Sequence, residues 1–425
     1  MSVTTAAGIG PGVDGFEGWA RAVESRDARF DGRVFVAVTS TGIYCRPVCP
    51  APTPQRRHVR FFTQASAAER EGFRPCRRCR PGPRGDPLDR THAELVEGAL
   101  AIVQGAGTVS ALARRLGVST GHLRRAFATE LGGTPGRVVR GARAGGRLSL
   151  ALRSRAPFDA EGLLAFLRDR AIAGVEEVRG STYRRSLSTS FGPVALSASP
   201  EEDRLRLEIA FEDVRSVPTA ARAARSVFDL DADPSSIART LERDPALRPL
   251  VRSHPGIRLP GAADGFEVAV RAIVGQQVSV AAARTVLGRI AARFGCPLDG
   301  RTVFPTAEAL AGAPLEELGI VGRRAGAIRR VATMVARGEL GLGGDGDPEE
   351  TVGRLLEVDG IGPWTAEYIR MRALRDPDAF VAGDLGVRRA FERLGLDANT
   401  RTIVTRAEAW RPWRAYATML LWRVA

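Results

Sequence analysis

Four cysteines near the N-terminal end of the chain have the spacing of a metal site. Cys45 and Cys49 are separated by three residues, Cys76 and Cys79 by two, and 26 residues lie between the pairs. Two short loops of this kind can place four thiolates around one tetrahedral Zn²⁺ ion at about 2.3 Å. A pair of disulfides is the alternative, but thiols in a cytoplasmic chain stay reduced. We therefore predict a structural zinc site, and we expect the fifth cysteine, Cys296, to be a surface or packing thiol.

A tight hairpin between two helices is predicted in LLEVDGIGPWTAEYI (Leu355–Ile369). Gly360 and Gly362 bracket one apolar residue and let the backbone turn sharply. Peptide N–H groups at such a turn can approach the phosphate oxygens of a partner, as backbone amides at a helix N-terminus do for anions.

The helix after this hairpin carries two aromatic residues with a carboxylate one loop further on. Trp364 and Tyr368 are four residues apart, so they share one helix face and are placed to flank a flat ligand such as a base. Asp384 is expected at the mouth of that pocket. A role for Asp384 as N-cap of a helix beginning near Leu385 is compatible with this position.

The predicted secondary structure that must hold these candidate residues changes along the chain. A Pro/Gly/Arg-rich connector (residues 80–87) precedes a helical segment that begins near Leu88. Residues 158–218 contain short alternating pieces that suit antiparallel strands, and from Thr219 onward the chain is mostly helical.

The segment TVSALARRLGVSTGHLRRAFATELGGTP has a helix-turn-helix pattern. Gly117 supports the turn, and Ser119 is the candidate N-cap of the second helix. His122, Arg124 and Arg125 are left for solvent or for the major groove of DNA. A generic helical hairpin without DNA contacts is the alternative.

From about Pro157 to the C-terminus the chain resembles the AlkA-type alkylated-base glycosylases of the helix-hairpin-helix superfamily. The hairpin carries the resemblance together with FEVAVRAIVGQQVSVAAART and WRPWRAYATMLLW, in the same order. It implies a small α+β subdomain, then helical subdomains with a base pocket in the cleft between them. Residues implied by position are catalytic Asp384 and the base-pocket aromatics Phe166, Trp364, Tyr368 and Trp422. Core packing is an equal alternative for Phe166.

Two positions depart from this family, and one residue type is missing. Leu385 stands where the best-known member has a pocket tyrosine, and Gln277 stands where it has an apolar wedge, so a polar plug is expected. The chain contains no lysine. Bifunctional members cut the strand through a Schiff base that a lysine forms with the sugar, and no lysine side chain is present here to form one. We predict a monofunctional glycosylase that leaves an abasic site.

The sequence around the cysteines, RFDGRVFVAVTSTGIYCRPVCPAPTP and FRPCRRC, resembles the N-terminal domain of Ada-type repair proteins. The resemblance implies that zinc-bound Cys45 accepts a methyl group from a methylated DNA phosphate, once per molecule. A plain zinc knuckle is the alternative.

The helix-turn-helix resembles the first unit of AraC-type regulators, but the chain leaves no room for a second unit. The Pro-Cys-His-Arg motif of alkylguanine methyltransferases is absent.

Charge and composition agree with a DNA-binding repair protein. Residues 1–155 hold 25 Arg against 12 Asp and Glu, a net charge of +13, whereas residues 156–425 carry +1. Phosphate contacts are therefore expected mainly from the N-terminal third. The alternative is a basic surface that contacts only solvent and does not bind DNA. No run approaches the length of a membrane span, and no signal peptide is apparent.

The predicted fold class is multidomain α+β: a small zinc-binding domain, a helix-turn-helix, a small antiparallel-sheet subdomain and an all-α helix-hairpin-helix glycosylase domain. The expected domain limits are 1–85 for the zinc and methyl-acceptor domain, 88–155 for the shortened helix-turn-helix, 156–218 for the α+β subdomain and 219–425 for the glycosylase domain.

The leading hypothesis is a cytoplasmic, monomeric protein that repairs double-stranded DNA carrying alkylated bases or methylated phosphates. It would excise N-alkylated purines of the 3-methyladenine and 7-methylguanine type and use one Zn²⁺. Whether the hairpin carbonyls also hold a monovalent cation stays open. The alternatives are a methylation-activated sensor or regulator with a non-catalytic glycosylase fold, and a glycosylase whose N-terminal domain only tethers it to DNA.

Overall fold

The computed structural model describes residues 10–11, 16–24, 26–27, 30–31, 34–81, 92–103, 108–143, 146–343 and 347–425. The chain forms two compact units that interleave in sequence. Unit 1 comprises Met1–Asp89, Asp231–Pro255 and Leu385–Ala425, and unit 2 comprises Arg90–Leu230 and Gly256–Asp384. None of the helices in the described ranges is long and apolar enough to span a bilayer.

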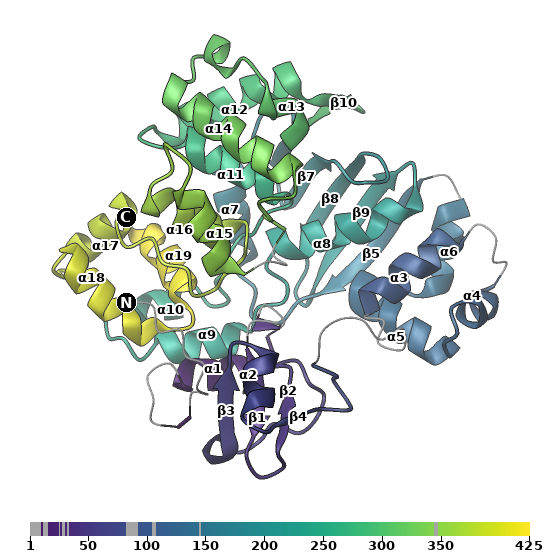
Figure 1. The fold of residues 1–425 in the computed structure, drawn as a ribbon. Coiled ribbons are helices and arrows are strands. Elements are labelled where there is room, and N and C mark those ends of the chain that lie inside the picture. Colours follow the sequence, from purple (N-terminus) through teal and green to yellow (C-terminus); the bar gives the residue numbers. More distant parts are fainter. Residues whose placement is uncertain are drawn as a thin grey trace. The chain divides into compact units, whose positions relative to one another are not determined.

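The N-terminal part of unit 1 is built on a four-stranded sheet in the order β3-β1-β2-β4, shown in purple in Figure 1. Strand β1 is antiparallel to β2 and β3, whereas β2 and β4 are parallel. Alternation of apolar residues buries Phe35, Ala37 and Phe62 in a small core. The elements are α1 (Phe16–Glu24), β1 (Phe35–Val38), β2 (Ile43–Cys45), η2 (Arg56–His58), β3 (Val59–Phe62), α2 (Ala65–Arg70) and β4 (Arg74–Pro75).

The rest of unit 1 is helical. Asp244 is buried and accepts hydrogen bonds from the indole of Trp410 at 2.8 Å and from Arg406 at 2.7 Å, which ties two distant chain segments together. Phe30 lies edge-on to Trp413, with ring centroids 5.7 Å apart, so this aromatic residue packs on the helical part. The elements are α9 (Pro234–Leu241), α10 (Arg248–Ser253), α17 (Leu385–Arg393), α18 (Thr400–Ala407), η6 (Glu408–Trp410) and α19 (Arg414–Val424).

Unit 2 begins with the helix-turn-helix predicted from the sequence. The side chain of Ser119 accepts a hydrogen bond from the N–H of His122 at 3.1 Å, which confirms the predicted N-cap. Gly117 has φ +70° and makes the turn. The expected helix start near Leu88 and most of the connector lie outside the described residues. The elements are α3 (His92–Ala101), α4 (Val109–Arg115), α5 (Thr120–Leu131) and α6 (Pro135–Arg143).

A five-stranded antiparallel sheet follows, in the order β5-β9-β8-β7-β6 (Figure 1). Strand β5 pairs with β9 from Arg147↔Ala210 to Arg153↔Arg204, so the sheet begins before the predicted boundary at residues 155 and 156. The alternation in RLSLALR buries Leu148, Leu150 and Leu152 on one face. The elements are β5 (Arg147–Arg153), α7 (Ala160–Arg170), β6 (Glu176–Arg179), β7 (Thr182–Leu187), β8 (Val194–Pro200), β9 (Arg204–Phe211), η4 (Val214–Ser216) and α8 (Val217–Val227).

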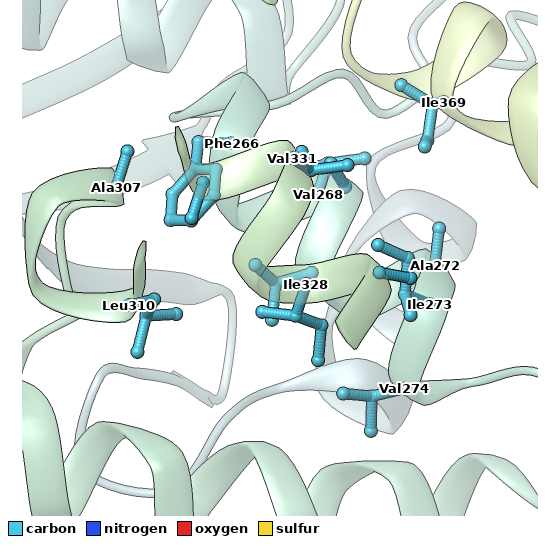
Figure 2. Packing of buried hydrophobic residues seen from close by; sticks show 14 of the residues in the cluster. Phe266, Val268, Ala272, Ile273, Val274, Ala307, Leu310, Ile328, Val331 and Ile369 are labelled. Carbon is cyan, nitrogen blue, oxygen red and sulfur yellow. The ribbon is translucent and has the colours of Figure 1, made fainter. Parts of the chain in front are cut away.

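A large apolar core of unit 2 lies among the helices that follow. Phe266, Leu310, Val331 and Ile369 come from four different helices and pack into one cluster (Figure 2). This core fixes the helices that flank the hairpin. The elements are α11 (Gly265–Val274), α12 (Val280–Phe294), β10 (Cys296–Leu298), β11 (Arg301–Val303), α13 (Ala307–Ala311), η5 (Leu315–Leu318), α14 (Gly322–Ala336), α15 (Pro348–Leu356) and α16 (Pro363–Arg372).

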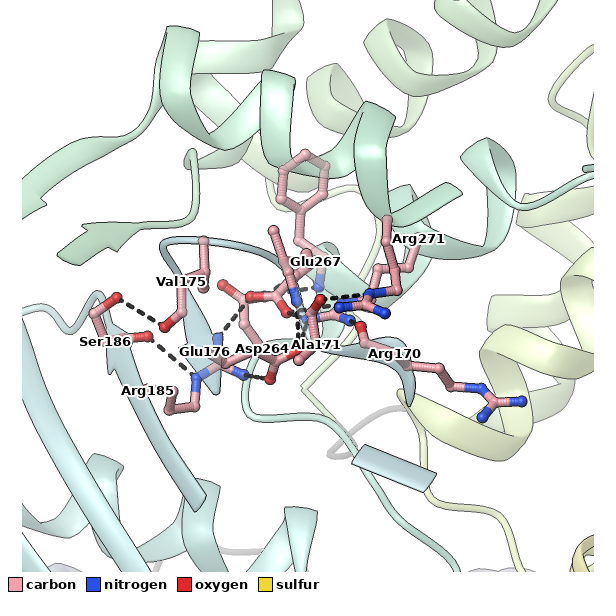
Figure 3. Close-up of polar contacts among 12 residues, drawn as sticks. Arg170, Ala171, Val175, Glu176, Arg185, Ser186, Asp264, Glu267 and Arg271 are labelled. Atoms are coloured by element: carbon pink, nitrogen blue, oxygen red, sulfur yellow. Dashed lines mark hydrogen bonds and ion pairs between the residues drawn. The ribbon is translucent and has the colours of Figure 1, made fainter. Parts of the chain in front are cut away.

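A buried ion network joins the sheet to α11. Arg185 on β7 donates to Glu267 at 2.6 Å, and Arg271 pairs with both Glu267 and Glu176 (Figure 3). Glu267 and Arg185 are nearly fully buried. Burial by itself would raise the pKa of Glu267, but the charges and hydrogen bonds of the two arginines outweigh it and lower the pKa to about 2.

Glu267→Gln is expected to lower the free energy of unfolding by about 3 kcal/mol at neutral pH, because Arg185 loses its closest counter-charge inside the protein. A carboxylate with a lowered pKa stabilises the fold above its ordinary pKa of 4.5, and this stabilisation is lost as the pH falls towards 2. Urea unfolding at several pH values should therefore show a difference that shrinks below about pH 4.5. Exposed Glu202→Gln is the control, and an equal loss in both variants would contradict the assignment.

Candidate active site and metal centre

The hairpin between α15 and α16 has the geometry that its glycines predict. Gly360 has φ +92°, a left-handed conformation that favours glycine, and a Cβ there would lie 3.3 Å from the backbone oxygen of Arg323. Ile361 is buried, and its N–H donates to the oxygen of Val358 at 3.0 Å. Gly362 precedes α16 without a capping side chain among the described residues. The N–H groups of the first turn are thus left for an outside acceptor.

The loop between α11 and α12 is tied to this hairpin by Gln276. Its side-chain amide donates to the oxygen of Gly360 at 2.8 Å and to the hydroxyl of Thr365 at 2.9 Å. The next residue, Gln277, is exposed and has φ +56°. A non-glycine residue in this conformation costs of order 1 kcal/mol and is typical of functional loops. Val278 beside it is also exposed, at 39%.

Trp364 and Tyr368 stack directly on each other on α16. Their ring centroids are 5.3 Å apart and their planes differ by 20°. This separation is that of a directly stacked pair. The two rings therefore form one aromatic platform on α16, and their flanking of a flat ligand stays a prediction.

Asp384 lies against this platform. The indole N–H of Trp364 donates to Oδ2 of Asp384 at 3.0 Å, which fixes the carboxylate beside the rings. The N–H of Asp384 donates to the oxygen of Val381 at 2.9 Å, in the turn that comes directly before α17. The carboxylate is half-buried. A negatively charged group is thus held at a fixed place beside an aromatic surface.

Phe166 is 9% exposed, and its ring is covered by two guanidinium groups. Arg170 lies 3.9 Å and Arg372 4.8 Å from the ring centroid, measured from Cζ. Arg372 also donates to the hydroxyl of Tyr368 at 2.9 Å and to the carbonyl oxygen of Pro260. Phe166 thus belongs to the same cluster as the platform, through arginines that contact both.

Trp422 and Leu385 belong to unit 1. Trp422 is half-buried on α19, and Leu385 is 57% exposed at the start of α17. On the helix-turn-helix, Arg124 and Arg125 are exposed as expected, whereas His122 is half-buried and lies edge-on to His92 with ring centroids 5.8 Å apart.

The four cysteines come together at the ends of two parallel strands. Cys45 ends β2 and Cys76 follows β4, and the N–H of Cys76 donates to the oxygen of Tyr44 at 2.9 Å. The four sulfur atoms, including those of Cys49 and Cys79, all lie within 4.8 Å of one another. Tetrahedral zinc thiolates are about 3.8 Å apart, so the side chains present fit one Zn²⁺ ion.

The electrostatics of the cysteine cluster also favour a cation. A hydrogen bond from Cys45 lowers the pKa of Cys79 to about 6, and the backbone N–H of Arg46 adds to this at 3.3 Å from the sulfur. Burial raises the pKa of Cys49 to about 11. One thiolate is stabilised by its neighbours, and a divalent cation is needed to hold all four. Cys45 is only half-buried.

Three residues of this cluster are not among those predicted from the sequence: Gln276, Arg170 and Arg372. A signal for the two arginines was present, because each follows an aromatic residue by four positions on a helix, Phe166 and Tyr368 respectively. Gln276 carries no such signal, since its partners lie on a hairpin far along the chain.

Three family models match the chain. The AlkA N-terminal domain matches residues 149–264, the metal binding domain of Ada matches residues 19–82, and the HhH-GPD superfamily base excision DNA repair protein matches residues 270–415. The first of these matches begins within β5, in agreement with the sheet pairing.

Similar proteins include one from Mycobacterium tuberculosis named "Probable bifunctional transcriptional activator/DNA repair enzyme AlkA", which is 37% identical over 96% of both chains. The DNA-3-methyladenine glycosylase 2 of Escherichia coli is 36% identical over 63% of this chain and 94% of its own. Among solved structures, the 3-methyladenine DNA glycosylase of Archaeoglobus fulgidus superposes with a TM-score of 0.57 at 27% identity, over 64% of this chain and 96% of that one.

Proposed function

Because the chain belongs to the AlkA family of DNA alkylation repair glycosylases, in a form that carries an Ada metal-binding domain, we propose that it excises N-alkylated purines from double-stranded DNA. The observation that carries the proposal is the hydrogen bond from Trp364 to Asp384 beside the Trp364–Tyr368 platform. This hydrogen bond fixes a carboxylate beside the aromatic rings, which supports a role for Asp384 next to the sugar of a stacked base.

The chemistry required of this site is modest. N-alkylation makes a purine cationic and weakens its bond to the sugar, so the protein must extrude the base, stack it and stabilise an oxocarbenium-like sugar. In the proposal, the base stacks on the platform and Asp384 supplies the negative charge. The same carboxylate positions or activates the attacking water. With no lysine in the chain, release leaves an intact abasic site.

The hairpin and the Gln277 loop are proposed to hold the DNA. The N–H groups at the start of α16, after Gly360 and Gly362, approach the phosphates, and Gln277 fills the gap left by the extruded base. Exposed Val278 gives this polar plug an apolar neighbour. The basic residues Arg124 and Arg125 of α5 add phosphate or major-groove contacts.

The N-terminal domain is proposed to accept methyl groups from DNA methylphosphotriesters at Cys45. A bound Zn²⁺ keeps the four thiolates deprotonated at neutral pH. The Cys45 sulfur attacks the methyl carbon, an S–C bond forms, and the C–O bond breaks with its electron pair going to the phosphate. The products are a thioether and an ordinary phosphodiester. Such a site works in a compartment that keeps thiols reduced, which supports a cytoplasmic location.

The proposal is tested by incubating the purified protein with methylated duplex DNA and measuring free 3-methyladenine and 7-methylguanine. Release with turnover supports a glycosylase. Tight binding of the damaged duplex without release would support the alternative of a non-catalytic sensor. A covalent imine trapped with borohydride would contradict the monofunctional assignment.

Gln276→Ala is expected to loosen the hairpin, because the oxygen of Gly360 and the hydroxyl of buried Thr365 each lose a donor. Amide hydrogen exchange of residues 360–366 should accelerate about tenfold, and base release should slow. Gln277→Ala is the matched control, because it removes the same side chain one residue on. It should leave amide exchange in the hairpin unchanged. Equal acceleration in both variants would show that the hydrogen bonds of Gln276 do not hold the hairpin.

A further inference from the structure

The helix-turn-helix is docked on the edge of the five-stranded sheet. Its helices lie beside β5, the strand at one end of the sheet order (Figure 1). Gly132 ends α5 with φ +59°, and a Cβ there would lie 2.0 Å from the backbone oxygen of Ala151 on β5. A Cβ on Gly141 of α6 would lie 2.8 Å from the side chain of Leu148. These two glycines therefore allow a close approach that larger residues would block.

The docked helices cover apolar side chains of β5. Leu148 and Leu150 are only 6% and 1% exposed. Gly133, in the turn before α6, leaves room for Leu150, whose Cδ2 would lie 3.5 Å from a Cβ at that position. An exposed ion pair at 2.8 Å also joins Glu97 of α3 to Arg222 of α8. Because separation would return apolar surface to water, we expect the helix-turn-helix to stay in place on the sheet.

Four arginines near the turn of this module are exposed: Arg114, Arg115, Arg124 and Arg125. The first two end α4, and the other two lie within about two helical turns of the start of α5. Within the described ranges, none of the four forms an ion pair with a carboxylate. Residues 92–143 contain seven arginines and three glutamates, a net charge of +4. Guanidinium groups gathered in this way favour the phosphates of duplex DNA.

The composition of α5 favours phosphate contacts over base recognition. The other exposed positions of this helix are Ala128 and Thr129. The helix contains no asparagine or glutamine, the side chains that recognise adenine through two hydrogen bonds. His122 is half-buried against His92. Contacts with phosphates fix the position of a protein on DNA and carry no sequence information.

We propose that the helix-turn-helix is a fixed arm of the protein that binds undamaged duplex DNA on one side of the lesion, through phosphates and independently of sequence. The inference rests on the proposed glycosylase function and adds to it a DNA contact with a defined direction. An arm docked at one edge of the sheet reaches one flank of the substrate. A module on a flexible linker would reach either flank.

The experiment measures the affinity of the full-length, zinc-bound protein for duplexes that carry one tetrahydrofuran abasic-site analogue, which marks the lesion and has no base to release. One flank at a time is shortened in steps from about two helical turns to about half a turn. Shortening one flank should weaken binding about tenfold at lengths at which shortening the other flank changes it less than about twofold. A change of flank sequence at constant length should leave the affinity unchanged.

A double variant tests whether the arginines of α5 make this contact. Arg124→Gln combined with Arg125→Gln should remove the difference between the two flanks. The slope of log affinity against log salt concentration should also fall by about 0.9 for each phosphate contact that is lost. The matched control combines Arg179→Gln with Arg337→Gln, whose side chains are 72% and 67% exposed elsewhere in the same compact unit. It removes the same charge and should keep the difference.

A glycine variant tests whether docking gives the contact its direction. Gly132→Ala should displace α5 from β5 and make the two flanks equivalent, because the added Cβ meets the backbone of Ala151. Gly180→Ala is the matched control. Gly180 has a similar left-handed conformation, with φ +56°, but a Cβ there would meet nothing within 4 Å. This control should keep the difference between the flanks.

Equal dependence on both flanks in the wild type would overturn the proposal, and so would a one-sided dependence that survives in the arginine double variant. A one-sided dependence that changes with the flank sequence would make the module a sequence-specific one instead. One-sided binding without base release from methylated DNA would count against the proposed glycosylase function alone. Base release with equal dependence on both flanks would count only against the fixed arm.

Discussion

Asp384→Asn is expected to lower base release about a thousandfold while binding of methylated DNA stays within a fewfold of wild type. Asparagine keeps the size of the side chain and an oxygen that can accept from the indole of Trp364. It removes the negative charge that would face a developing oxocarbenium ion. The effect should therefore appear in kcat, measured as free 3-methyladenine per unit time under single-turnover conditions.

A matched variant separates this effect from a general loss of charge. Asp203 is exposed in the turn between β8 and β9 and pairs with Arg204, so Asp203→Asn removes the same charge at a surface site of the same unit. It should release base at the wild-type rate. Equal base release by the wild type and Asp384→Asn would show that the carboxylate of Asp384 is not required for the reaction. No release by either, with binding intact, would favour the sensor.

Cys45→Ala is expected to abolish methyl uptake from methylphosphotriester DNA altogether, because a saturated carbon side chain has no nucleophile. Mass spectrometry of the wild type after reaction should place one added methyl group on the peptide that contains Cys45. Base release should persist in the variant, since the platform and Asp384 belong to the other compact unit.

The loss of one zinc ligand needs its own control. Cys45→Asp keeps an anionic ligand that zinc accepts. If this variant still binds zinc but takes up no methyl group, the loss of uptake is due to the missing nucleophile and not to loss of the metal. Cys296→Ala removes an exposed thiol outside the cluster and should leave methyl uptake intact. Methyl uptake that survives in both Cys45 variants would show that another group is the acceptor, and the plain zinc knuckle would then hold.

The parts of this protein that the sequence predicted best are those that local signals specify. Ser119 caps a helix and Gly360 takes a left-handed turn for reasons carried by the residues themselves and their nearest neighbours. The cysteine pairs likewise predicted their own cluster, which the structure confirms. Local rules of this kind need no knowledge of the rest of the chain.

The parts that the sequence did not predict depend on distant partners. The sequence predicts residues 147–153 as an extension of the helix-turn-helix segment, and only the pairing of β5 with β9 places them in the sheet. The direct stacking of Trp364 on Tyr368 depends on rotamers, which helical spacing does not determine. The roles of Phe166, Trp364, Tyr368 and Asp384 in the reaction stay predictions for the variants described above.

Gln276 also bears on how such a protein would search a genome. Its two hydrogen bonds tie the loop that carries Gln277 to the hairpin. In the proposed function, Gln277 then enters the duplex only when the hairpin is seated on the backbone. The requirement for two coincident contacts limits how often an undamaged base is interrogated, and so it protects normal DNA before any recognition of the base has taken place.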